Sequence, residues 1–319
     1  MKAEFFCLCM SPALDASVTL PAWPADGVIF KDVVETENVG GKGINLARWL
    51  ALRGAEVACG GLLGADNAAP FEQELARFGI GDAFVRVPGA TRRNEMIVTP
   101  EGSFKLNRPA FPGLPVDFDA LAVLEPGRGT RPACPRSRGT RDPTVPRVAI
   151  LSGSLPPAVP KDFYAAAIRA LKARGWIVVL DASGEALRLG VAAGPDLIKP
   201  NADECEPLVG FVPKTPDDFR RATETLRAQA AHVIISDGGA GAWFDGEFTA
   251  APQVEVLDTT SAGDTLLAEY CWRVWGGGVL DAPRDAPRWA VAAGSAAVTM
   301  PGSVPPPIDL VEQLKEKIR

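Results

Sequence analysis

The stretch Asp258-Thr259-Thr260-Ser261-Ala262-Gly263-Asp264-Thr265-Leu266-Leu267-Ala268 has small residues where a strand or loop passes into a helix, and an apolar run after them. The first backbone N–H groups of a helix have no partner inside the helix, and small side chains leave them open to an anion. Asp264 would lie beside such an anion, where it is a candidate to take a proton from an attacking hydroxyl. The alternative is that Asp264 caps an ordinary helix, and this stretch alone favours that simpler interpretation.

A second glycine-rich stretch, Gly40-Gly41-Lys42-Gly43, precedes a predicted helix that runs to a glycine stop at Gly54. Glycines before a helix allow a ligand to approach the backbone closely, and Lys42 adds a positive charge at the same place. The spacing matches neither a Walker A loop nor the dinucleotide-binding fingerprint. Together, however, the two stretches favour a functional role for Asp264 over a plain helix cap.

The charge balance argues against partners that need a basic surface. The 319 residues include 33 basic and 39 acidic side chains, which gives a net charge of −6. Neither nucleic acid nor an anionic membrane is therefore an expected partner. The N-terminus lacks the features of a signal peptide, and no apolar run reaches transmembrane length. We expect a cytoplasmic protein.

The six cysteines and the single histidine, His232, form no metal-binding pattern. There is no CxxC pair, and Cys7 and Cys9 would share one face of a buried strand. We predict free, buried thiols, and neither a histidine base nor a histidine metal site.

Buried strands alternate with helices along most of the chain, which is typical of α/β proteins. Residues 4–10 form a near-continuous apolar run, as expected of a strand buried on both faces of a sheet. Polar or glycine-rich residues follow successive strands, and the carboxyl ends of parallel strands share the edge where ligands bind. The residues that we expect to converge at this edge are Asp15, Gly41, Ser152, Asp181, Asn201, Gly238 and Asp264.

Three segments depart from this alternation. Residues 16–38 are predicted to form short strands of a small antiparallel excursion, and residues 91–107 a hairpin. Arg92, Arg93 and Lys105 in this hairpin could converge on a substrate phosphate, although charges on an exposed edge strand are the simpler explanation. Residues 125–146 contain five prolines, five arginines and three glycines, so we predict an irregular loop there.

In this order and combination, the motifs resemble those of the ribokinase-like, or PfkB, carbohydrate kinases over nearly the whole chain apart from residues 125–146. The motifs that carry the resemblance are Pro12-Ala13-Leu14-Asp15, Gly40-Gly41-Lys42-Gly43-Ile44-Asn45, Thr91-Arg92-Arg93-Asn94, Ser152-Gly153-Ser154-Leu155-Pro156, Asp181-Ala182-Ser183-Gly184-Glu185, Lys199-Pro200-Asn201-Ala202-Asp203-Glu204 and Thr260-Ser261-Ala262-Gly263-Asp264. Several of them are similar to the phosphosugar branch, which contains 1-phosphofructokinase, tagatose-6-phosphate kinase and the minor 6-phosphofructokinase.

The resemblance implies one kinase domain over residues 1–319, built as a three-layer α/β/α sandwich with a small β-sheet lid. The lid would be formed by about residues 11–38 and 90–108, and such lids are often shared across a homodimer. The implied reaction is transfer of the γ-phosphoryl group of ATP to a sugar-phosphate hydroxyl with Mg²⁺. Fructose 1-phosphate is the leading acceptor.

The resemblance also implies roles for individual residues. Asp264 would be the catalytic base, and the N–H groups of Ser261, Ala262, Gly263 and Asp264 would stabilise the transferring phosphoryl group. The acceptor would contact Asp15, Gly41 and Asn45 through its hydroxyls, and Lys42 and Arg92, with Lys31 and Lys105 as helpers, through its phosphate. The nucleotide would contact Lys199, Asn201, Glu204, Ser236, Gly238 and Gly241, and Asn201 and Glu204 would also organise the Mg²⁺ waters.

Several residues depart from the family pattern, among them Ser261, Glu269 and Lys105. Ser261 replaces the usual first glycine of Gly-Ala-Gly-Asp, which is tolerable if its backbone keeps a negative φ. Glu269 replaces a glycine. Lys105 stands where 1-phosphofructokinases usually carry glutamate, so 6-phosphofructokinase and tagatose-6-phosphate kinase stay open as alternatives. A third alternative is a kinase of an unphosphorylated sugar or nucleoside, but Lys42 and Arg92 argue against it. A fourth is a catalytically weak protein that binds a sugar phosphate.

Overall fold

Strand β1 (Glu4–Cys9) shows why the chain folds into layers. Its side chains alternate between two hydrophobic clusters: Phe5, Cys7 and Cys9 pack into one, and Leu8 packs into the other. Successive side chains of a strand point to opposite faces of a sheet, so both faces of β1 must be covered. The predicted burial of residues 4–10 on both faces is confirmed.

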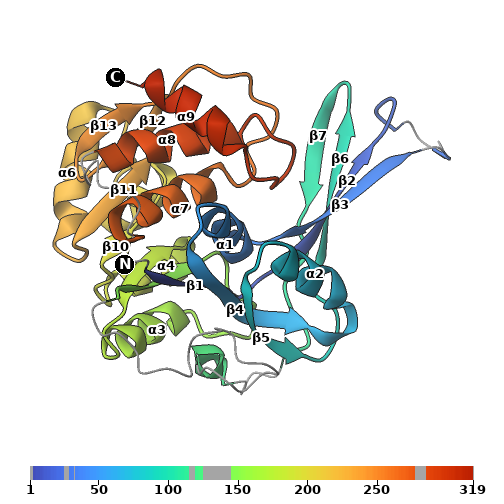
Figure 1. Ribbon diagram of the computed structural model, residues 1–319, viewed down its shortest axis with the longest axis horizontal. Helices are drawn as coiled ribbons and strands as arrows, with labels where there is room; N and C mark the ends of the chain where they lie inside the picture. The colour runs from blue at the N-terminus through green and yellow to red at the C-terminus, as the bar shows by residue number, and fades with distance from the viewer. Residues whose placement is uncertain are drawn as a thin grey trace.

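The computed structural model describes residues 3–24, 29–31, 33–114, 119–124, 145–276 and 285–318. Within them, the main sheet has nine strands in the order β13-β12-β11-β10-β9-β8-β1-β4-β5 (Figure 1). Its other strands are β4 (Glu56–Gly64), β5 (Gly81–Val87), β8 (Arg147–Ser152), β9 (Ile177–Asp181), β10 (Leu197–Ile198), β11 (His232–Ser236), β12 (Gly241–Phe244) and β13 (Glu247–Ala250). Neighbouring strands are parallel from β11 to β5, and β12 and β13 add an antiparallel edge.

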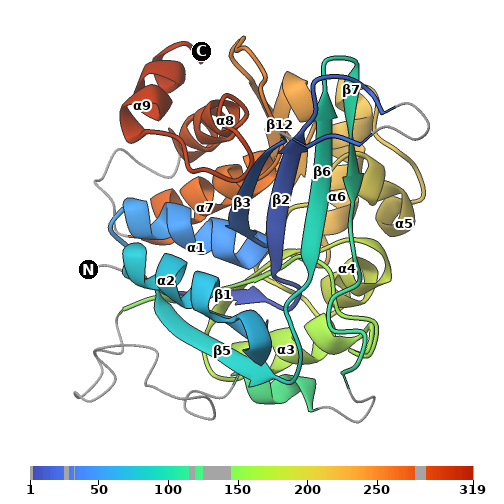
Figure 2. The same ribbon diagram turned by 90° about the vertical axis from the view of Figure 1, so that its right-hand side faces the viewer.

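Helices cover both faces of the main sheet, which makes the predicted three-layer α/β/α sandwich (Figures 1 and 2). One face carries α1 (Lys42–Leu52), α2 (Ala69–Arg77), α7 (Ala262–Trp275), α8 (Ala286–Ala297) and α9 (Ile308–Glu316). The other carries α3 (Phe163–Lys172), α4 (Gly184–Val191) and α6 (Pro216–Arg227). Shorter helical segments are α5 (Glu206–Val209), η1 (Ala65–Asn67), η2 (Ala120–Leu124), η3 (Asp203–Cys205) and η4 (Gly238–Ala240).

A separate four-stranded sheet, here called the side sheet, stands beside the main sheet and projects from it (Figures 1 and 2). Its strands, in spatial order, are β3 (Val34–Gly40), β2 (Ala13–Thr19), β6 (Arg93–Thr99) and β7 (Gly102–Leu106). The predicted hairpin is confirmed as β6–β7. The antiparallel pairing predicted within residues 16–38 is confirmed as β2–β3, and β2 also pairs with β6 of the hairpin, in parallel. The predicted loop at 125–146 lies almost wholly outside the described residues.

The thiol prediction holds for the cysteines that the structure describes: Cys7, Cys9, Cys59, Cys205 and Cys271 are free and buried. Burial raises the pKa of the Cys9 thiol to about 11, so it stays protonated at neutral pH. Across the same described ranges, we find no helix with the length and apolar character that a membrane span requires.

Candidate active site

A cavity of about 620 Å³ lies where the side sheet meets the carboxyl edge of the main sheet and the N-termini of α1 and α7. The edge of a parallel sheet is the expected position for a ligand in this kind of fold. Both glycine-rich stretches reach it, although they are more than 200 residues apart in the chain. The predicted site residues that line it are Asp15, Gly41, Lys42, Asn45, Arg92, Lys105, Glu204, Ser261, Gly263 and Asp264.

Arg92 and Lys105 bring positive charge to the cavity from the side sheet. Arg92 donates hydrogen bonds to the carbonyl oxygens of Ser11 (3.1 Å) and Arg108 (2.8 Å), and Lys105 Nζ donates to Thr260 Oγ1 (2.9 Å). Neither cation forms an ion pair with a carboxylate among the described residues. Their partners are neutral, so both charges are available to an anionic ligand.

Arg93, by contrast, does not serve the cavity. It forms ion pairs with three carboxylates of the side sheet, those of Glu35, Glu37 and Glu95. Its charge is therefore already balanced, and the simpler explanation of a charged strand position applies to it. Lys31 is exposed and does not line the cavity either.

Asp15 enters the cavity from β2, and its carboxylate is oriented by Asn94 of β6. Asn94 Nδ2 donates to Asp15 Oδ1 over 2.8 Å, and the register of the two parallel strands places these residues side by side. Asp15 therefore presents a held carboxylate, which suits recognition of ligand hydroxyl groups. Asn94 was part of a recognised motif but had no predicted role.

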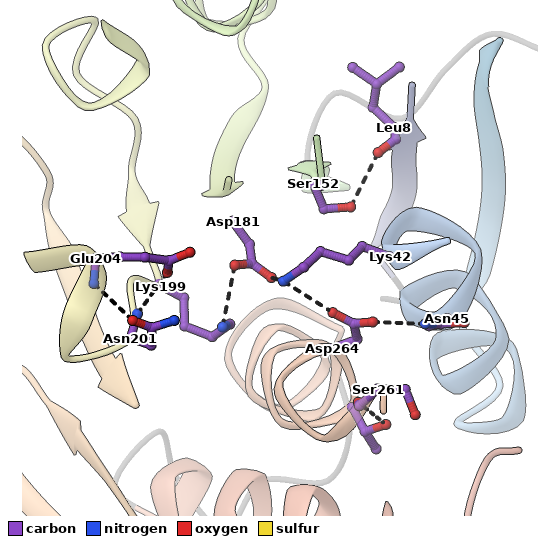
Figure 3. Close-up of polar contacts among 12 residues, drawn as sticks. Leu8, Lys42, Asn45, Ser152, Asp181, Lys199, Asn201, Glu204, Ser261 and Asp264 are labelled. Atoms are coloured by element: carbon purple, nitrogen blue, oxygen red, sulfur yellow. Dashed lines mark hydrogen bonds and ion pairs between the residues drawn. The ribbon is translucent and has the colours of Figure 1, made fainter. Parts of the chain in front are cut away.

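Two charged residues that line the cavity, Lys42 and Asp264, lie close to two buried ones, Asp181 and Lys199 (Figure 3). Lys42 Nζ lies 3.0 Å from Asp181 Oδ2 and 3.6 Å from Asp264 Oδ1. Lys199 Nζ lies 3.3 Å from Asp181 Oδ1. Asp181 thus bridges the two lysines, and its side chain is 2% exposed. The sequence placed Asp181 at this edge without a role; the structure makes it the residue that positions both cations.

The pKa values of the two carboxyls move in opposite directions. Burial, and secondly the charge of Asp181, raises the pKa of Asp264 above its ordinary value, although Lys42, Lys199 and a hydrogen bond from Asn45 oppose the shift. Burial alone would also raise the pKa of Asp181, but the two lysines outweigh burial and lower it. Asp264 is therefore the stronger base of the two, as a carboxylate that accepts a proton requires.

The N-terminus of α7 has the features of an anion site. Asp264 is in its first turn, and a Cβ placed on Gly263 would meet only the side chain of Lys199, with Nζ at 3.3 Å. An ammonium group therefore lies beside the backbone N–H groups that open the helix. Lys199, expected near the nucleotide, is placed by the structure beside this helix end and Asp181.

Ser261 corrects one expectation. It is the N-cap of α7 with φ 64° and ψ 0°, in the left-handed region, and its side chain makes no capping hydrogen bond. The condition under which serine would be tolerated here, a negative φ, is therefore not met. Its carbonyl accepts both N–H (2.8 Å) and Oγ1 (3.0 Å) of Thr265, which fixes the peptide orientation. Serine therefore holds a conformation that glycine adopts without strain.

The predicted nucleotide residues cluster at the ends of β10 and β11. Asn201 forms an isolated parallel bridge with Ser236, and Asn201 and Glu204 are tied together by reciprocal bonds: Asn201 N–H donates to Glu204 Oε2 (2.9 Å) and Glu204 N–H to Asn201 Oδ1 (2.8 Å). Gly238 adopts a positive φ of 51° just beyond β11. Gly241 has a packing explanation, because a Cβ there would collide with the Thr249 carbonyl of β13.

Arg48 was missed altogether. A charged residue inside a helix is usually exposed, but Arg48 is 3% exposed, and its guanidinium donates to Asn45 beside the cavity. The sequence feature that could have indicated a role for Arg48 is its position three residues after Asn45, which puts both side chains on the same face of α1.

Comparison with known proteins identifies the family of the chain. The sequence profile of the pfkB family carbohydrate kinases matches residues 26–104 and 146–309, well over half of the chain. The chain belongs to the pfkB family. It is therefore a carbohydrate kinase, a phosphotransferase. The pfkB profile leaves out residues 105–145, which include most of the proline- and arginine-rich segment.

Among the similar proteins of known name are two 1-phosphofructokinases and a phosphofructokinase-2. The 1-phosphofructokinase of Rhodobacter capsulatus is 34% identical over 271 residues, which cover 81% of this chain and 80% of that protein. The 1-phosphofructokinase of Vibrio cholerae is 33% identical over 244 residues, covering 73% and 71%. The crystal structure of Escherichia coli phosphofructokinase-2 in complex with potassium superposes with a TM-score of 0.80 at 25% identity and covers 99% of both chains.

Proposed function

We propose that this pfkB kinase transfers the γ-phosphoryl group of ATP to a hydroxyl of a ketohexose phosphate, with fructose 1-phosphate as the acceptor and fructose 1,6-bisphosphate as the product. One observation carries the proposal: the cavity holds the buried carboxylate Asp264 at a helix N-terminus and, from the side sheet, two cations that pair with no carboxylate in the described part of the chain, Arg92 and Lys105. The first suits phosphoryl transfer, and the second suits an acceptor that already carries a phosphate. Similarity to 1-phosphofructokinases supports the choice of fructose 1-phosphate.

In the proposed reaction, Asp264 takes the proton of the attacking hydroxyl as its oxygen bonds to the γ-phosphorus. The bond from that phosphorus to the bridging oxygen breaks, and ADP leaves. Catalysis of this step depends mostly on alignment and on stabilising charge. We assign that stabilisation to the backbone N–H groups of Ser261, Ala262, Gly263 and Asp264, with Lys199 beside them. Lys42, which faces Asp264 and Asp181 (Figure 3), lies at this end of the cavity.

We assign acceptor binding to the residues on the other side of the same cavity. Asp15, Gly41 and Asn45 would contact the sugar hydroxyls, and Arg92 and Lys105 the phosphate that the acceptor brings. Lys42 was predicted to join this phosphate clamp, but two carboxylates already balance its charge. Its contribution to binding the acceptor phosphate should therefore be smaller than that of Arg92. Lys31 stays a proposed helper outside the cavity.

We assign the nucleotide to the edge formed by Lys199, Asn201, Glu204, Ser236, Gly238 and Gly241. The donor set also fits Mg²⁺, which prefers oxygen ligands and keeps several of its waters. Asn201 Oδ1 and Glu204 Oε2 are occupied by backbone N–H groups, so these residues suit contacts through water better than direct ligation. When bound with ATP, Mg²⁺ supplies neutralisation of phosphate charge.

We also propose that the side sheet acts as a lid over the cavity and joins two copies of the chain in a homodimer. Lys105 of β7 already contacts Thr260, next to the start of α7. The opposite face of β7 exposes Phe104 and Leu106, 39% and 46% accessible, which a second side sheet would cover. A cytoplasmic location follows from the proposed substrates, since ATP and sugar phosphates are cytoplasmic metabolites. Light scattering on the purified protein would test the dimer.

A coupled ADP-release assay with Mg²⁺-ATP tests the function. It compares fructose 1-phosphate, fructose 6-phosphate, tagatose 6-phosphate and free fructose. We expect turnover with fructose 1-phosphate and none with free fructose. Preference for fructose 6-phosphate would instead select a 6-phosphofructokinase, the candidate that Lys105 and the likeness to phosphofructokinase-2 favour. Preference for free fructose would refute the assignment of Arg92 and Lys105 to the acceptor phosphate. Absence of turnover with all four acceptors would refute the proposed function.

A further inference from the structure

Arg48 links the catalytic end of α1 to three other parts of the fold. We propose that it is a positioning residue for Asp264: it fixes the Asn45 amide so that the NH₂ group of that amide, and not its oxygen, faces the catalytic carboxylate. This inference rests on the proposed function, because it takes Asp264 to be the base.

Two consecutive hydrogen bonds connect Arg48 to Asp264 through Asn45, and the chemistry of the end groups fixes which atoms donate. Arg48 Nη2 donates to Asn45 Oδ1 over 2.6 Å, and Asn45 Nδ2 donates to Asp264 Oδ2 over 2.8 Å. A guanidinium has only donors and an ionised carboxylate only acceptors. Turning the amide over would set its NH₂ group against the guanidinium and its oxygen against the carboxylate, so both contacts would become repulsive. Arg48 therefore selects one of the two amide orientations.

The guanidinium is itself held by acceptors from other elements. Arg48 Nη2 also donates to the Val39 carbonyl of β3 (3.0 Å) and to Ser303 Oγ (3.0 Å), and Nη1 donates to Glu74 Oε1 of α2 (3.0 Å). Arg48 and Asn45 are three residues apart on α1, so they share a face of the helix. A planar, forked cation can reach several acceptors at fixed angles, which a lysine ammonium cannot. The position of the fork is thus set by tertiary contacts.

The orientation of Asn45 affects how readily Asp264 ionises. The groups that face Asp264 are Lys42 and Asn45 of α1, Asp181 of β9 and Lys199 beyond β10. An N–H group donated by Asn45 stabilises the ionised carboxylate, whereas an oxygen in the same place would destabilise it. Loss of the Arg48 fork should therefore raise the pKa of Asp264 and leave less of the base ionised at neutral pH.

The test compares Arg48→Lys with Glu74→Gln in the otherwise intact protein, using the preferred ketohexose phosphate of the wild type. Arg48→Lys keeps the positive charge near Asp264 but loses the fork. We expect kcat/KM at neutral pH to fall about 10-fold or more, since a hydrogen bond to a charged group is lost, and the acid limb of the kcat/KM profile to move to higher pH. Glu74→Gln weakens the contact between Glu74 and Arg48 but keeps the hydrogen bond from Arg48 to Asn45. The acid limb of the kcat/KM profile of this variant should therefore not move to higher pH.

A second variant and a second measurement keep the test decisive. If Arg48→Lys does not fold, the double variant Arg48→Lys with Glu74→Gln removes the Glu74 carboxylate, which would otherwise lose its contact with the guanidinium and keep only its longer ion pair with Arg77 (3.6 Å). The same shift of the acid limb is expected. Carbon-13 NMR titration of the carboxyls, assigned with Asp264→Asn, follows the Asp264 pKa without turnover. An unmoved pKa in Arg48→Lys, or an equal upward shift in Glu74→Gln, would overturn the inference while leaving the kinase assignment intact. Absence of turnover by the wild type with every acceptor would refute the proposed kinase function. The NMR titration would still decide whether Arg48 affects the pKa of Asp264.

Discussion

Charged side chains are buried at two positions between α1 and α7: the cavity end, at the N-termini of both helices, and the far end, where α1 stops beside Glu269 in the middle of α7. The two positions bury charge differently. The helices run side by side in the same direction (Figures 1 and 2), with Asn45 bonded to Asp264 at their N-termini and Trp49 Nε1 bonded to Glu269 Oε2 (2.8 Å) one turn further on. At the N-terminal end, the Lys42 side chain is 43% exposed and opens onto the cavity. At the far end, the Glu269 side chain is completely buried.

At the far end, the buried carboxylate of Glu269 is paired with two partly buried arginines. Glu269 accepts hydrogen bonds from Trp49 and Arg273 (2.8 Å), and it forms an ion pair with Arg53, whose Nε lies 3.2 Å from Oε2. The Arg53 guanidinium lies 4.2 Å from the ring centre of Trp272, so aromatic rings complete the enclosure. This arrangement suits stability, because a buried ion is tolerated when it is paired and hydrogen-bonded. The cavity end instead leaves Asp264 with a raised pKa, which agrees with the role of base that we propose for it.

The largest expected effect is at the cavity end, from Asp264→Asn. Removing the base should lower kcat by about 10³-fold, while substrate binding and the unfolding temperature should change little, because burial already disfavours the charge of Asp264. Steady-state kinetics and thermal unfolding on the same samples measure both. Turnover close to that of the wild type would remove Asp264 from the role of base and erase the contrast between the two ends.

The far end should give the reverse pattern in Glu269→Ala. This change leaves Arg53 and Arg273 without their buried carboxylate, which should cost about 3–5 kcal/mol of unfolding free energy. Turnover per folded molecule should stay within about threefold of the wild type, as the change lies more than a helical turn from Asp264. Glu316→Ala is the matched control, since Glu316 is 75% exposed in its ion pair with Lys315 and should matter little. Urea titrations of both variants decide the point; equal destabilisation would contradict it.

Acid pH should separate activity from folding. Asp264 has a raised pKa, so the base is lost by protonation at a higher pH than an ordinary carboxylate. The pKa of Asp181 in the folded protein is lower than its ordinary value of 3.8. The ion pairs of Asp181 therefore stabilise the fold fully above its pKa in the unfolded chain. That stability is lost only as the pH falls through its lower pKa in the folded protein. We expect a pH range in which the protein is folded but inactive. Coincident curves for kcat/KM and tryptophan fluorescence would argue against it.

The smallest expected effect is from Ser261→Gly. Relief of the left-handed backbone at Ser261 should stabilise the fold by about 1 kcal/mol, less the extra chain entropy that glycine has when unfolded. Turnover should change by less than about twofold, because the backbone N–H groups of the anion site stay in place. Ser261→Ala, which keeps the strain and loses only the hydroxyl, is the control. A gain in thermal stability for alanine equal to that for glycine would rule out backbone strain as the cause.

The amino-acid sequence by itself determined the features that depend on local pattern. Continuous apolar runs such as residues 4–10 predicted the buried parallel strands, and small residues before apolar runs predicted that helices begin near Gly41 and Asp264. The structure confirms these strands and helix starts, because strand burial and helix termini depend on residues that are close in the chain. The ligand-binding roles of Gly41 and Asp264 stay predictions. The order of the motifs was enough to identify the family.

Only the tertiary structure decided which partner each charge takes. Lys42 pairs with Asp181, 139 residues away, and Arg48 is buried against Ser303, 255 residues away. The left-handed backbone of Ser261 and the parallel pairing of β2 with β6 were likewise invisible in the sequence. The physical reason is that an ion pair or a strand pairing depends on distances in space, which the packing of the whole chain sets. A local pattern can bring a lysine to the correct edge of the sheet, but the packed fold selects the carboxylate that it meets.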